Sequence, residues 1–301
     1  MRCDNCDGAP VYNRRYSGQK FCHDHFTEYF ERKVKKTIND SGMIKRGERI
    51  GVALSGGKDS ITLLSILNKM EDIELFAIAV DEGIKGYREK SLHVAKKFCK
   101  ETDISLEIIS FKNSFGVTVD ETKDHACSFC GVLRRRLLND RAKELGLDKL
   151  ATGHNLDDET QAIMINYIRG DPERLLRLSN STHSDKFVPR IKPLQEMPEK
   201  EVGLYAVLNF NIDFSECPYA GDSFRTGIRD FINTLERDNP GIKFSIKRGY
   251  EKLTPYLESY PTKELKECPL CGEPTSGEVC KVCDMLQSTK MFINDNKNRR
   301  E

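Results

Sequence analysis

Short apolar runs and amphipathic segments alternate through the middle of this chain. The runs with the length and composition of strands cover residues 49–54, 75–80, 104–110 and 149–153, and the segments with helical spacing of apolar residues cover 61–70, 87–100, 132–146 and 156–170. Strands that alternate with helices predict an α/β fold, in which helices cover both faces of a parallel sheet. Ligands of such sheets bind at the carboxyl ends of the strands, so the segments that follow the strands are the first candidates for a site.

The segment "SGGKDS", Ser55 to Ser60, directly follows the first of these strands. Small residues let backbone N–H groups approach a phosphate closely, and the positive end of the following helix faces the anion. Lys58 adds a full positive charge, and Asp59 and Ser60 can cap the helix or orient a ligand. The segment does not match the common G-x-x-x-x-G-K-[ST] loop, so we expect phosphate binding by a loop of a different kind.

A second polar segment, "GHNLDDE", follows the fourth strand, at the same edge of the predicted sheet. Its adjacent carboxylates, Asp157 and Asp158, point about 100° apart if they lie on a helix, so we expect only one of them to face a ligand. Both can also serve only as negative charges at a helix N-terminus. One pocket can hold this segment and the "SGGKDS" loop together.

Ten of the eleven cysteines fall into three groups. The first and last groups have the patterns C-x2-C, fifteen residues, C-x2-H and C-x2-C, eight residues, C-x2-C. Each short pair presents two soft ligands from one tight turn, which suits tetrahedral zinc. The predicted zinc ligands are Cys3, Cys6, Cys22 and His25 near the N-terminus and Cys268, Cys271, Cys280 and Cys283 near the C-terminus. His23 is an alternative to His25, which has the better spacing.

The central group consists of one pair, Cys127 and Cys130 in "CSFCGVLRRR", and the distant Cys217 in "SECPYA". Three cysteines leave a metal site one ligand short. A third structural zinc would need His125 as its fourth ligand. The remaining cysteine, Cys99, lies on a predicted helix, and we expect it to be a buried apolar residue.

The composition points to a soluble globular protein, because 38% of the residues are hydrophobic and 32% are charged. No apolar run approaches the ~20 residues that span a bilayer, and the N-terminus lacks the apolar core of a signal peptide. We therefore expect a cytoplasmic protein that does not enter a membrane. In a reducing compartment, clustered cysteines indicate metal binding and not disulfides. The net charge of +1 neither favours nor excludes a nucleic-acid partner.

The loop "SGGKDS" after a strand resembles the pyrophosphate-binding loop of the PP-loop ATP pyrophosphatases. With "CSFCGVLRRR", "ATGHNLDDE", "SECPYA" and the two terminal zinc groups, the chain resembles the tRNA 2-thiouridine synthetases (tRNA thiolases) over essentially its full length. This resemblance implies the adenine nucleotide α-hydrolase-like fold and three parts: an N-terminal zinc module at 1–30, a PP-loop thiolase domain at 31–260 and a C-terminal zinc ribbon at 261–301.

The same resemblance implies an ATP site with Mg²⁺. The residues implied to bind the nucleotide are Ala53, Leu54, Ser55, Gly56, Gly57, Lys58, Asp59, Ser60, Ala79, Arg134, Gly153 and Asp158. Lys58 would contact the phosphates, and Asp158 would face ATP and Mg²⁺. Arg134 stands where the family has a basic residue that meets the nucleotide, four positions after the second central cysteine. The neighbouring Arg135 and Arg136 spread around the predicted helix, so the three arginines cannot all face one site.

The resemblance further implies that the three central cysteines hold a [4Fe–4S] cluster with one iron free to bind hydrosulfide. The implied catalytic residues are Cys127, Cys130, Cys217, Lys58, Arg134 and Asp158. The implied reaction is ATP-dependent 2-thiolation, in which the C2 oxygen of a tRNA uridine, at the wobble position or in the T loop, is adenylated and replaced by sulfur. Sulfide or a ubiquitin-like thiocarboxylate protein would supply the sulfur. In the persulfide alternative, Cys130 or Cys217 carries the sulfur and Cys127 resolves it.

Two other functions fit parts of the pattern. One is another PP-loop enzyme, such as a lysine-tRNA-modifying ligase or an amidating synthetase, which needs no cluster. The other is a non-catalytic zinc protein that binds RNA. We expect tRNA to contact the zinc modules and residues 167–178, and we expect a homodimer. The proline-containing segment 184–202 predicts a loop, and the segment 224–246 predicts a helix that ends near Asn239.

Overall fold

The computed structural model describes residues 2–122, 126–178, 187–210, 216–220, 224–257, 259–260 and 265–298, with side chains up to residue 289. Its strands are β1 (Tyr12–Arg14), β2 (Gln19–Phe21), β3 (Arg49–Ala53), β4 (Glu74–Asp81), β5 (Ser105–Ser110), β6 (Lys149–Ala151), β7 (Arg190–Ile191), β8 (Lys266–Glu267) and β9 (Pro274–Thr275). Its helices are α1 (His23–Asp40), α2 (Lys58–Leu67), α3 (Arg88–Glu101), α4 (Phe111–Phe115), α5 (Ala126–Glu144), α6 (Leu156–Ile168), α7 (Pro172–Leu176), α8 (Glu199–Asn209), α9 (Phe224–Asp238), α10 (Ile242–Leu257) and α11 (Lys281–Asn298).

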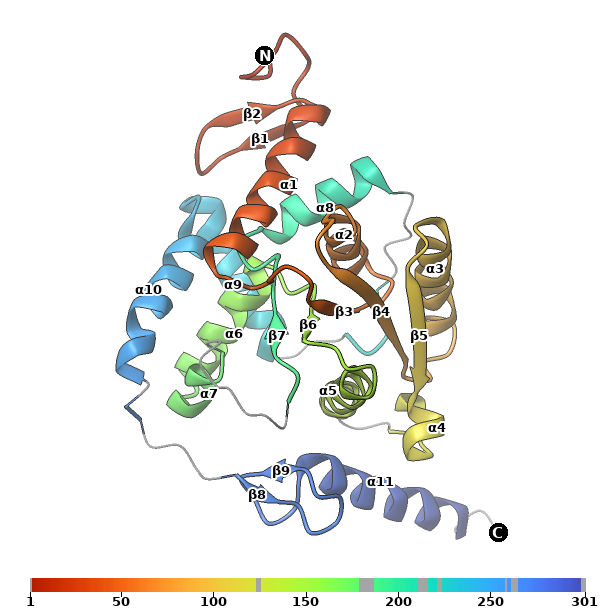
Figure 1. The fold of residues 1–301 in the computed structure, drawn as a ribbon. Coiled ribbons are helices and arrows are strands. Elements are labelled where there is room, and N and C mark those ends of the chain that lie inside the picture. Colours follow the sequence, from red (N-terminus) through yellow and green to blue (C-terminus); the bar gives the residue numbers. More distant parts are fainter. Residues whose placement is uncertain are drawn as a thin grey trace.

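A five-stranded parallel sheet in the order β5-β4-β3-β6-β7 forms the centre of the molecule (Figure 1). From β3 the chain first adds β4 and β5 on one side and then β6 and β7 on the other. The order therefore reverses between β3 and β6, and the loops that follow these two strands diverge there. A crevice at such a switch point is the usual ligand site of an open α/β sheet. The "SGGKDS" loop follows β3, and "GHNLDDE" follows β6.

Two apolar clusters cover the two faces of the sheet. Helices α1, α2, α3 and α8 pack on one face, with Phe30, Ile61 and Tyr205 fully buried among them. Helices α4 and α5 pack on the other face through Phe111 and Leu133 (Figure 1). Removing such side chains from water supplies about 1.5–3 kcal/mol each, which fixes the layers on either side of the site. The α/β architecture with helices on both faces is confirmed.

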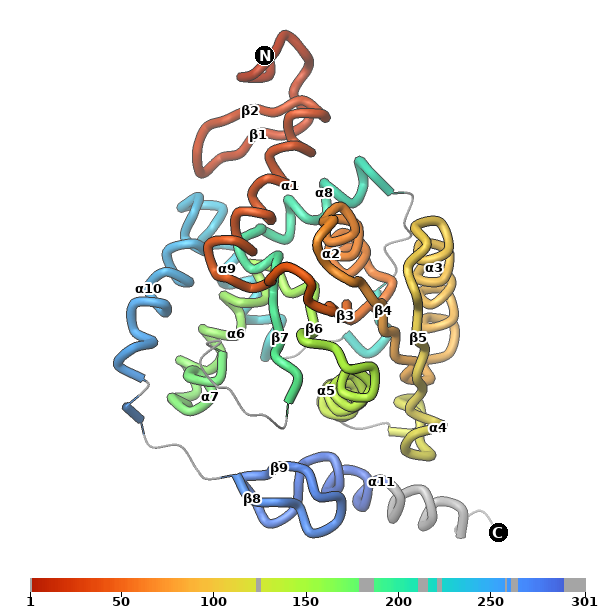
Figure 2. Tube along the Cα trace, viewed as in Figure 1, coloured from red at the N-terminus to blue at the C-terminus, as the bar shows by residue number. Residues whose placement is uncertain are grey.

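Small modules lie at opposite ends of the molecule (Figure 2). The N-terminal hairpin β1–β2 leads directly into α1, and the C-terminal hairpin β8–β9 leads into α11. The C-terminal module packs on the α5 face of the core through Val282, Met285 and Leu286. Among the described helices, none is both long enough and apolar enough to cross a membrane.

The structure corrects two local expectations from the sequence. Helix α5 begins at Ala126, so Cys127 and Cys130 lie inside its first two turns and not before the helix. The segment 184–202 is not simply a loop, because β7 pairs with β6 and α8 starts at Glu199, directly after Pro198. Proline is tolerated at a helix start because the first N–H groups have no partner within the helix. The expected end of a helix near Asn239 is confirmed, since α9 ends at Asp238.

Candidate functional site

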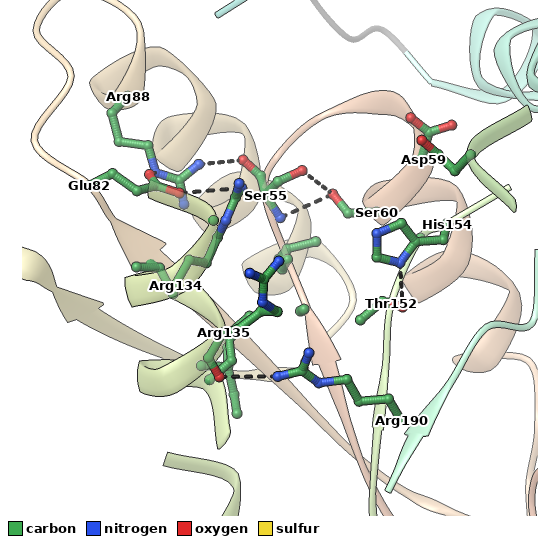
Figure 3. A pocket seen from close by; sticks show the side chains of 18 residues that line it. Ser55, Asp59, Ser60, Glu82, Arg88, Arg134, Arg135, Thr152, His154 and Arg190 are labelled. Carbon is green, nitrogen blue, oxygen red and sulfur yellow. Dashed lines mark hydrogen bonds and ion pairs between the residues drawn. The ribbon is translucent and has the colours of Figure 1, made fainter. Parts of the chain in front are cut away.

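A cavity of about 360 Å³ opens at the carboxyl ends of β3, β4 and β6 and is closed on one side by α5 (Figure 3). It is lined by Ala53, Leu54, Ser55, Asp59, Ser60, Ile78, Val80, Glu82, Arg88, Gly131, Arg134, Arg135, Leu138, Thr152, Gly153, His154, Asp158 and Arg190. Apolar strand ends form its floor, and charged side chains surround its mouth. This combination fits a ligand with a flat apolar part and a strongly charged part.

The loop after β3 has the shape of an anion cradle. The Ser55 N–H donates to Ser60 Oγ at 3.1 Å, and the Gly57 N–H donates to Ser55 Oγ at 3.3 Å, which closes the turn over the start of α2. Gly56 has a φ of +83°, and a Cβ there would lie 2.0 Å from the carbonyl oxygen of Ser91. Only glycine fits this conformation and this close approach. The N-terminal end of α2 thus faces the cavity with its backbone N–H groups available to an anion.

Charged groups of the loop are held by ion pairs. Lys58 Nζ lies 3.1 Å from a carboxylate oxygen of Asp59 and 2.9 Å from one of Glu199. Burial lowers the pKa of Lys58, but the charge of Asp59 and the hydrogen bond that Lys58 donates to Glu199 outweigh it, so the net shift is upward and Lys58 stays a cation. Burial raises the pKa of Asp59, against the opposing effect of Lys58.

Asp158 faces the same cavity from the first turn of α6. Its carboxylate lies 2.9 Å from Arg225 Nη2, and burial raises its pKa while Arg225 opposes that shift. Its neighbour Asp157 points away and pairs with the buried Lys243. The expectation that only one of the adjacent carboxylates faces the pocket therefore agrees with this geometry.

The wall opposite the loop carries cations. Arg134 and Arg135 lie on α5, and Arg190 donates from Nη2 to the carbonyl oxygen of Arg135 at 3.1 Å (Figure 3). Burial, aided by the charge of Arg135, lowers the pKa of Arg190 to about 10. His154 shares a 2.8 Å hydrogen bond with Thr152, and burial, aided by the charge of Lys192, lowers its pKa to about 4. His154 is open to the cavity but surrounded by protein, so we expect a neutral imidazole at pH 7.

The central cysteines lie in or against the first turns of α5, and none of them belongs to the lining of the cavity. Cys127 Sγ donates to the carbonyl oxygen of Tyr219 at 3.0 Å, which places the segment 216–220 against the start of α5. Cys217 packs on the apolar cluster that contains Cys130. Burial raises the pKa of the Cys130 thiol to about 11, Arg134 opposes this shift, and the charges of Glu82, Cys217 and Cys127 add to it. His125 lies outside the described residues.

Each terminal cysteine group converges on a point. In both groups the four ligand atoms lie within 4.8 Å of one another, and His25 belongs to the first group. Two of the distances are 3.7 Å between Cys6 Sγ and Cys22 Sγ and 3.6 Å between Cys271 Sγ and Cys280 Sγ. Tetrahedral zinc with bonds of about 2.3 Å to sulfur separates its ligands by about 3.8 Å, so both donor sets fit zinc. His23 instead hydrogen-bonds to Asp24.

Many residues expected from the sequence line the cavity: Ala53, Leu54, Ser55, Asp59, Ser60, Arg134, Gly153 and Asp158. Gly56, Gly57 and Lys58 belong to the loop but not to the cavity wall, and Ala79 is buried beside the lining residues Ile78 and Val80. Gly153 approaches the backbone of Asp59 and Ser60, where a Cβ would lie 3.0–3.2 Å from the nearest atoms.

Sequence reasoning missed six polar residues of the wall: Glu82, Arg88, Arg135, Thr152, His154 and Arg190. Three of them carried a signal, because Glu82 lies two residues after a predicted strand, and Thr152 and His154 flank Gly153 in "ATGHNLDDE".

Comparison with known proteins adds a second line of evidence. A model of the PP-loop domain matches residues 26–232, and a model of the N-terminal LIM domain of the 2-thiouridine synthetase TtuA matches residues 2–27. The tRNA 2-thiolation protein NcsA of Haloferax volcanii is 37% identical, with 96% of this chain and 99% of that protein covered. The chain belongs to the tRNA 2-thiolation family of PP-loop proteins.

Other members of this family show the same full-length agreement. The tRNA-5-methyluridine(54) 2-sulfurtransferase of Pyrococcus horikoshii is 37% identical over 94% of this chain and 93% of its own length. A solved structure, the U34-tRNA thiolase NcsA of Methanococcus maripaludis with its [4Fe-4S] cluster, has a TM-score of 0.82 and 42% identity, with 94% and 95% of the two chains covered. The recognition from sequence is thereby confirmed.

Proposed function

We propose that this protein is an ATP-dependent tRNA-uridine 2-sulfurtransferase that forms AMP and pyrophosphate. One observation carries the proposal: a single cavity joins the PP-loop at Ser55–Ser60 to the helix that bears Cys127 and Cys130. Thiolation needs an activated uridine oxygen and a sulfur source within reach of the same carbon, and this arrangement brings the two parts of the reaction together.

The chain's own residues can support adenylation. The backbone N–H groups at the start of α2 would hold the phosphates of ATP, and Lys58 would turn to them from Glu199. The apolar floor at Ile78 and Val80 suits adenine. Asp158 and Asp59 would hold Mg²⁺, and when bound this ion would neutralise phosphate charge. The C2 oxygen of the uracil would attack the α-phosphate, and pyrophosphate would leave. Arg134 would stabilise the charge that develops there.

The three central cysteines fit an iron–sulfur cluster better than a third zinc. Their sulfur atoms are not among the described groups that converge within 4.8 Å, so the donor set is wider than that of the two zinc groups. When bound, a [4Fe–4S] cluster with three cysteine ligands would offer one iron to an external sulfur ligand. Cys130, buried in α5, would then hold the cluster next to Arg134 at the cavity wall.

A strip of exposed aromatic and basic side chains lies at the C-terminal end of α6. Tyr167 is 67% exposed, and the guanidinium of Arg169 lies 5.2 Å from the ring centroid of Phe224. Of the arginines expected to meet phosphates, Arg174 pairs with Asp171 and Arg177 with Glu173. We therefore assign tRNA contact to this strip and the zinc modules, and a homodimer and cytoplasmic location complete the proposal.

The test is reconstitution under anaerobic conditions with iron, sulfide, ATP, Mg²⁺ and unmodified tRNA. Mass spectrometry of the digested tRNA should show a 2-thiouridine derivative, and its position in the sequenced fragments separates the wobble site from the T loop. Iron-free protein serves as the control and should give none. Equal thiolation by iron-free protein would contradict a role for the cluster, and no thiolation by any preparation would contradict the proposed function.

A further inference from the structure

A buried carboxylate links the PP-loop to the cysteine-bearing helix. Glu82, directly after β4, is 4% exposed and lies between two arginines (Figure 3). Its Oε2 is 2.8 Å from Arg88 Nε, and its Oε1 is 3.5 Å from Arg134 Nη1. The Arg88 contact is an ion pair whose Nε–H is not aligned for a hydrogen bond. One carboxylate therefore serves two cations from different helices.

The Arg88 side of this chain fixes the loop. Arg88 Nη1 donates to the carbonyl oxygen of Ser55 at 2.6 Å and to Ser91 Oγ at 3.0 Å. Gly56 lies directly against the carbonyl of Ser91. The first turn of α3 thus contacts the first two residues of the PP-loop, and Arg88, 3% exposed, is the side chain that holds them.

The Arg134 side fixes the opposite wall. Arg134 lies one helical turn after Cys130 on α5 and is 43% exposed toward the cavity. Among the described residues, Glu82 is the carboxylate with which Arg134 forms an ion pair. A long cation without this partner would sample many rotamers, and the nucleotide would have to order it on binding.

We propose that Glu82 is a positioning residue that keeps the PP-loop and the cysteine-bearing helix in register, so that ATP and the sulfur site meet at the same uridine. Only the part of this inference that concerns the sulfur site rests on the proposed function. The position of the PP-loop is tested by ATP binding alone. The backbone of Glu82 is itself fixed, since its carbonyl accepts the Val119 N–H at 2.9 Å. Without the Glu82 charge, Arg88 is a buried cation that has lost its ion pair, and the positive charges of Arg88 and Arg134 repel each other.

The experiment compares Glu82→Gln with Glu107→Gln in the full-length, cluster-loaded protein. Glu107 is a matched control, because it also joins a strand to α5, through a 3.0 Å ion pair with Arg141, but does not line the cavity. We expect Glu82→Gln to weaken ATP binding about tenfold and to slow single-turnover thiolation about a hundredfold, since small misplacements of reacting groups cost rates of this size. Glu107→Gln should stay within about twofold on both measures.

The outcomes separate positioning from folding. Thermal unfolding and iron content are measured for both variants, and a merely structural role would lower the melting temperature of Glu82→Gln and leave ATP affinity and thiolation rate unchanged at 25 °C. That result overturns the inference. Absence of thiolation by the unmodified protein overturns the proposed function instead, while ATP affinity still decides the role of Glu82. If Glu82→Gln does not fold, the double variant Glu82→Gln, Arg88→Gln restores charge balance, and normal ATP affinity and thiolation in it overturn the inference equally.

Discussion

At the residue scale, Lys58 shows how the site is prepared to bind an anion. Its ammonium group pairs with Asp59 and with Glu199, and Glu199 comes from α8, a helix far along the chain. The side chain is 26% exposed, so it is both held and reachable. A triphosphate carries more charge than one carboxylate, so ATP can draw Lys58 away from Glu199.

We expect Lys58→Met to reduce ATP-dependent pyrophosphate release about a hundredfold, because a preorganised cation at developing phosphate charge contributes on this scale. Lys200→Met, which removes an exposed lysine of the same helix as Glu199, is the control and should change the rate by less than about twofold. Pyrophosphate release with ATP and tRNA is the measurement. An equal loss in both variants would argue against a specific role for Lys58.

His154 gives a pH prediction. Its folded pKa of about 4 lies below the ordinary value of 6.5, so the unfolded chain binds more protons between these two values. The stability that this histidine contributes is present above pH 6.5 and is lost as the pH falls toward 4. Melting temperatures from pH 7 to pH 4 should therefore fall less steeply in His154→Asn than in the unmodified protein, whereas His93→Asn, at an exposed position, should leave the slope unchanged.

At the scale of elements, α5 contributes residues to three places: the central cysteine group, the cavity and the contact with the C-terminal module. Its first turns carry Cys127 and Cys130, the next turn presents Arg134 to the cavity, and Arg136 reaches the C-terminal module. Arg136 Nη1 lies 3.7 Å from Cys271 Sγ, and Nη2 lies 3.5 Å from Glu273. Arg134 and Arg136 thus point to different partners, because residues two apart on a helix are rotated by about 200°.

Two buried thiols allow a matched test of the cluster on α5. Burial raises the pKa of both Cys130 and Cys99 to about 11. Without a bound metal, both therefore behave as unreactive buried thiols. We expect Cys130→Ala to lose most bound iron and visible absorption after anaerobic purification and to abolish thiolation. Cys99→Ala should keep all three, with a stability loss of about 1 kcal/mol for a lost buried group. Full thiolation by an iron-depleted Cys130→Ala protein would contradict the proposal.

At the scale of the whole molecule, the N-terminal module is joined to the core by a buried carboxylate. Glu201 of α8 is fully buried and accepts hydrogen bonds from Tyr12, Tyr16 and Tyr29 at 3.1, 2.6 and 3.2 Å. Burial, aided by the charge of Glu201, raises the pKa of Tyr29 to about 12. The same helix begins at Glu199, the partner of Lys58, so one element contacts both the module and the PP-loop.

Removal of zinc should separate tRNA binding from ATP binding, although α8 contacts both the N-terminal module and the PP-loop. A strong chelator should release about two zinc ions per chain, lower the melting temperature and weaken tRNA binding about tenfold or more, because structural zinc supplies the folding energy of such modules. ATP affinity should change by less than about threefold, because the cavity is lined by the central domain. Zinc content and filter binding of tRNA are the measurements, and a parallel loss of ATP affinity would show that the modules shape the cavity.

Local patterns in the sequence determined a large part of this protein. Hydrophobic periodicity predicted the strands at 49–53 and 74–81, and small residues predicted the loop that follows the first of them. The two zinc groups were predicted from the short spacing of their ligands. Family resemblance added the central cysteines and Arg134. The strand β7 is only two residues long and forms by pairing with β6, so it has no alternating sequence pattern from which it could be predicted.

Only the tertiary structure decided which charged groups meet. Glu82 with Arg134, Glu199 with Lys58, and the segment at Cys217 with Cys127 join positions far apart in the chain. Strand order and the packing of α3, α5 and α8 set these distances, and a charged side chain looks the same in sequence whether it is solvated or buried beside a counter-charge. The sequence therefore determined the chemical groups of the site, and the fold decided which pairs of them act together.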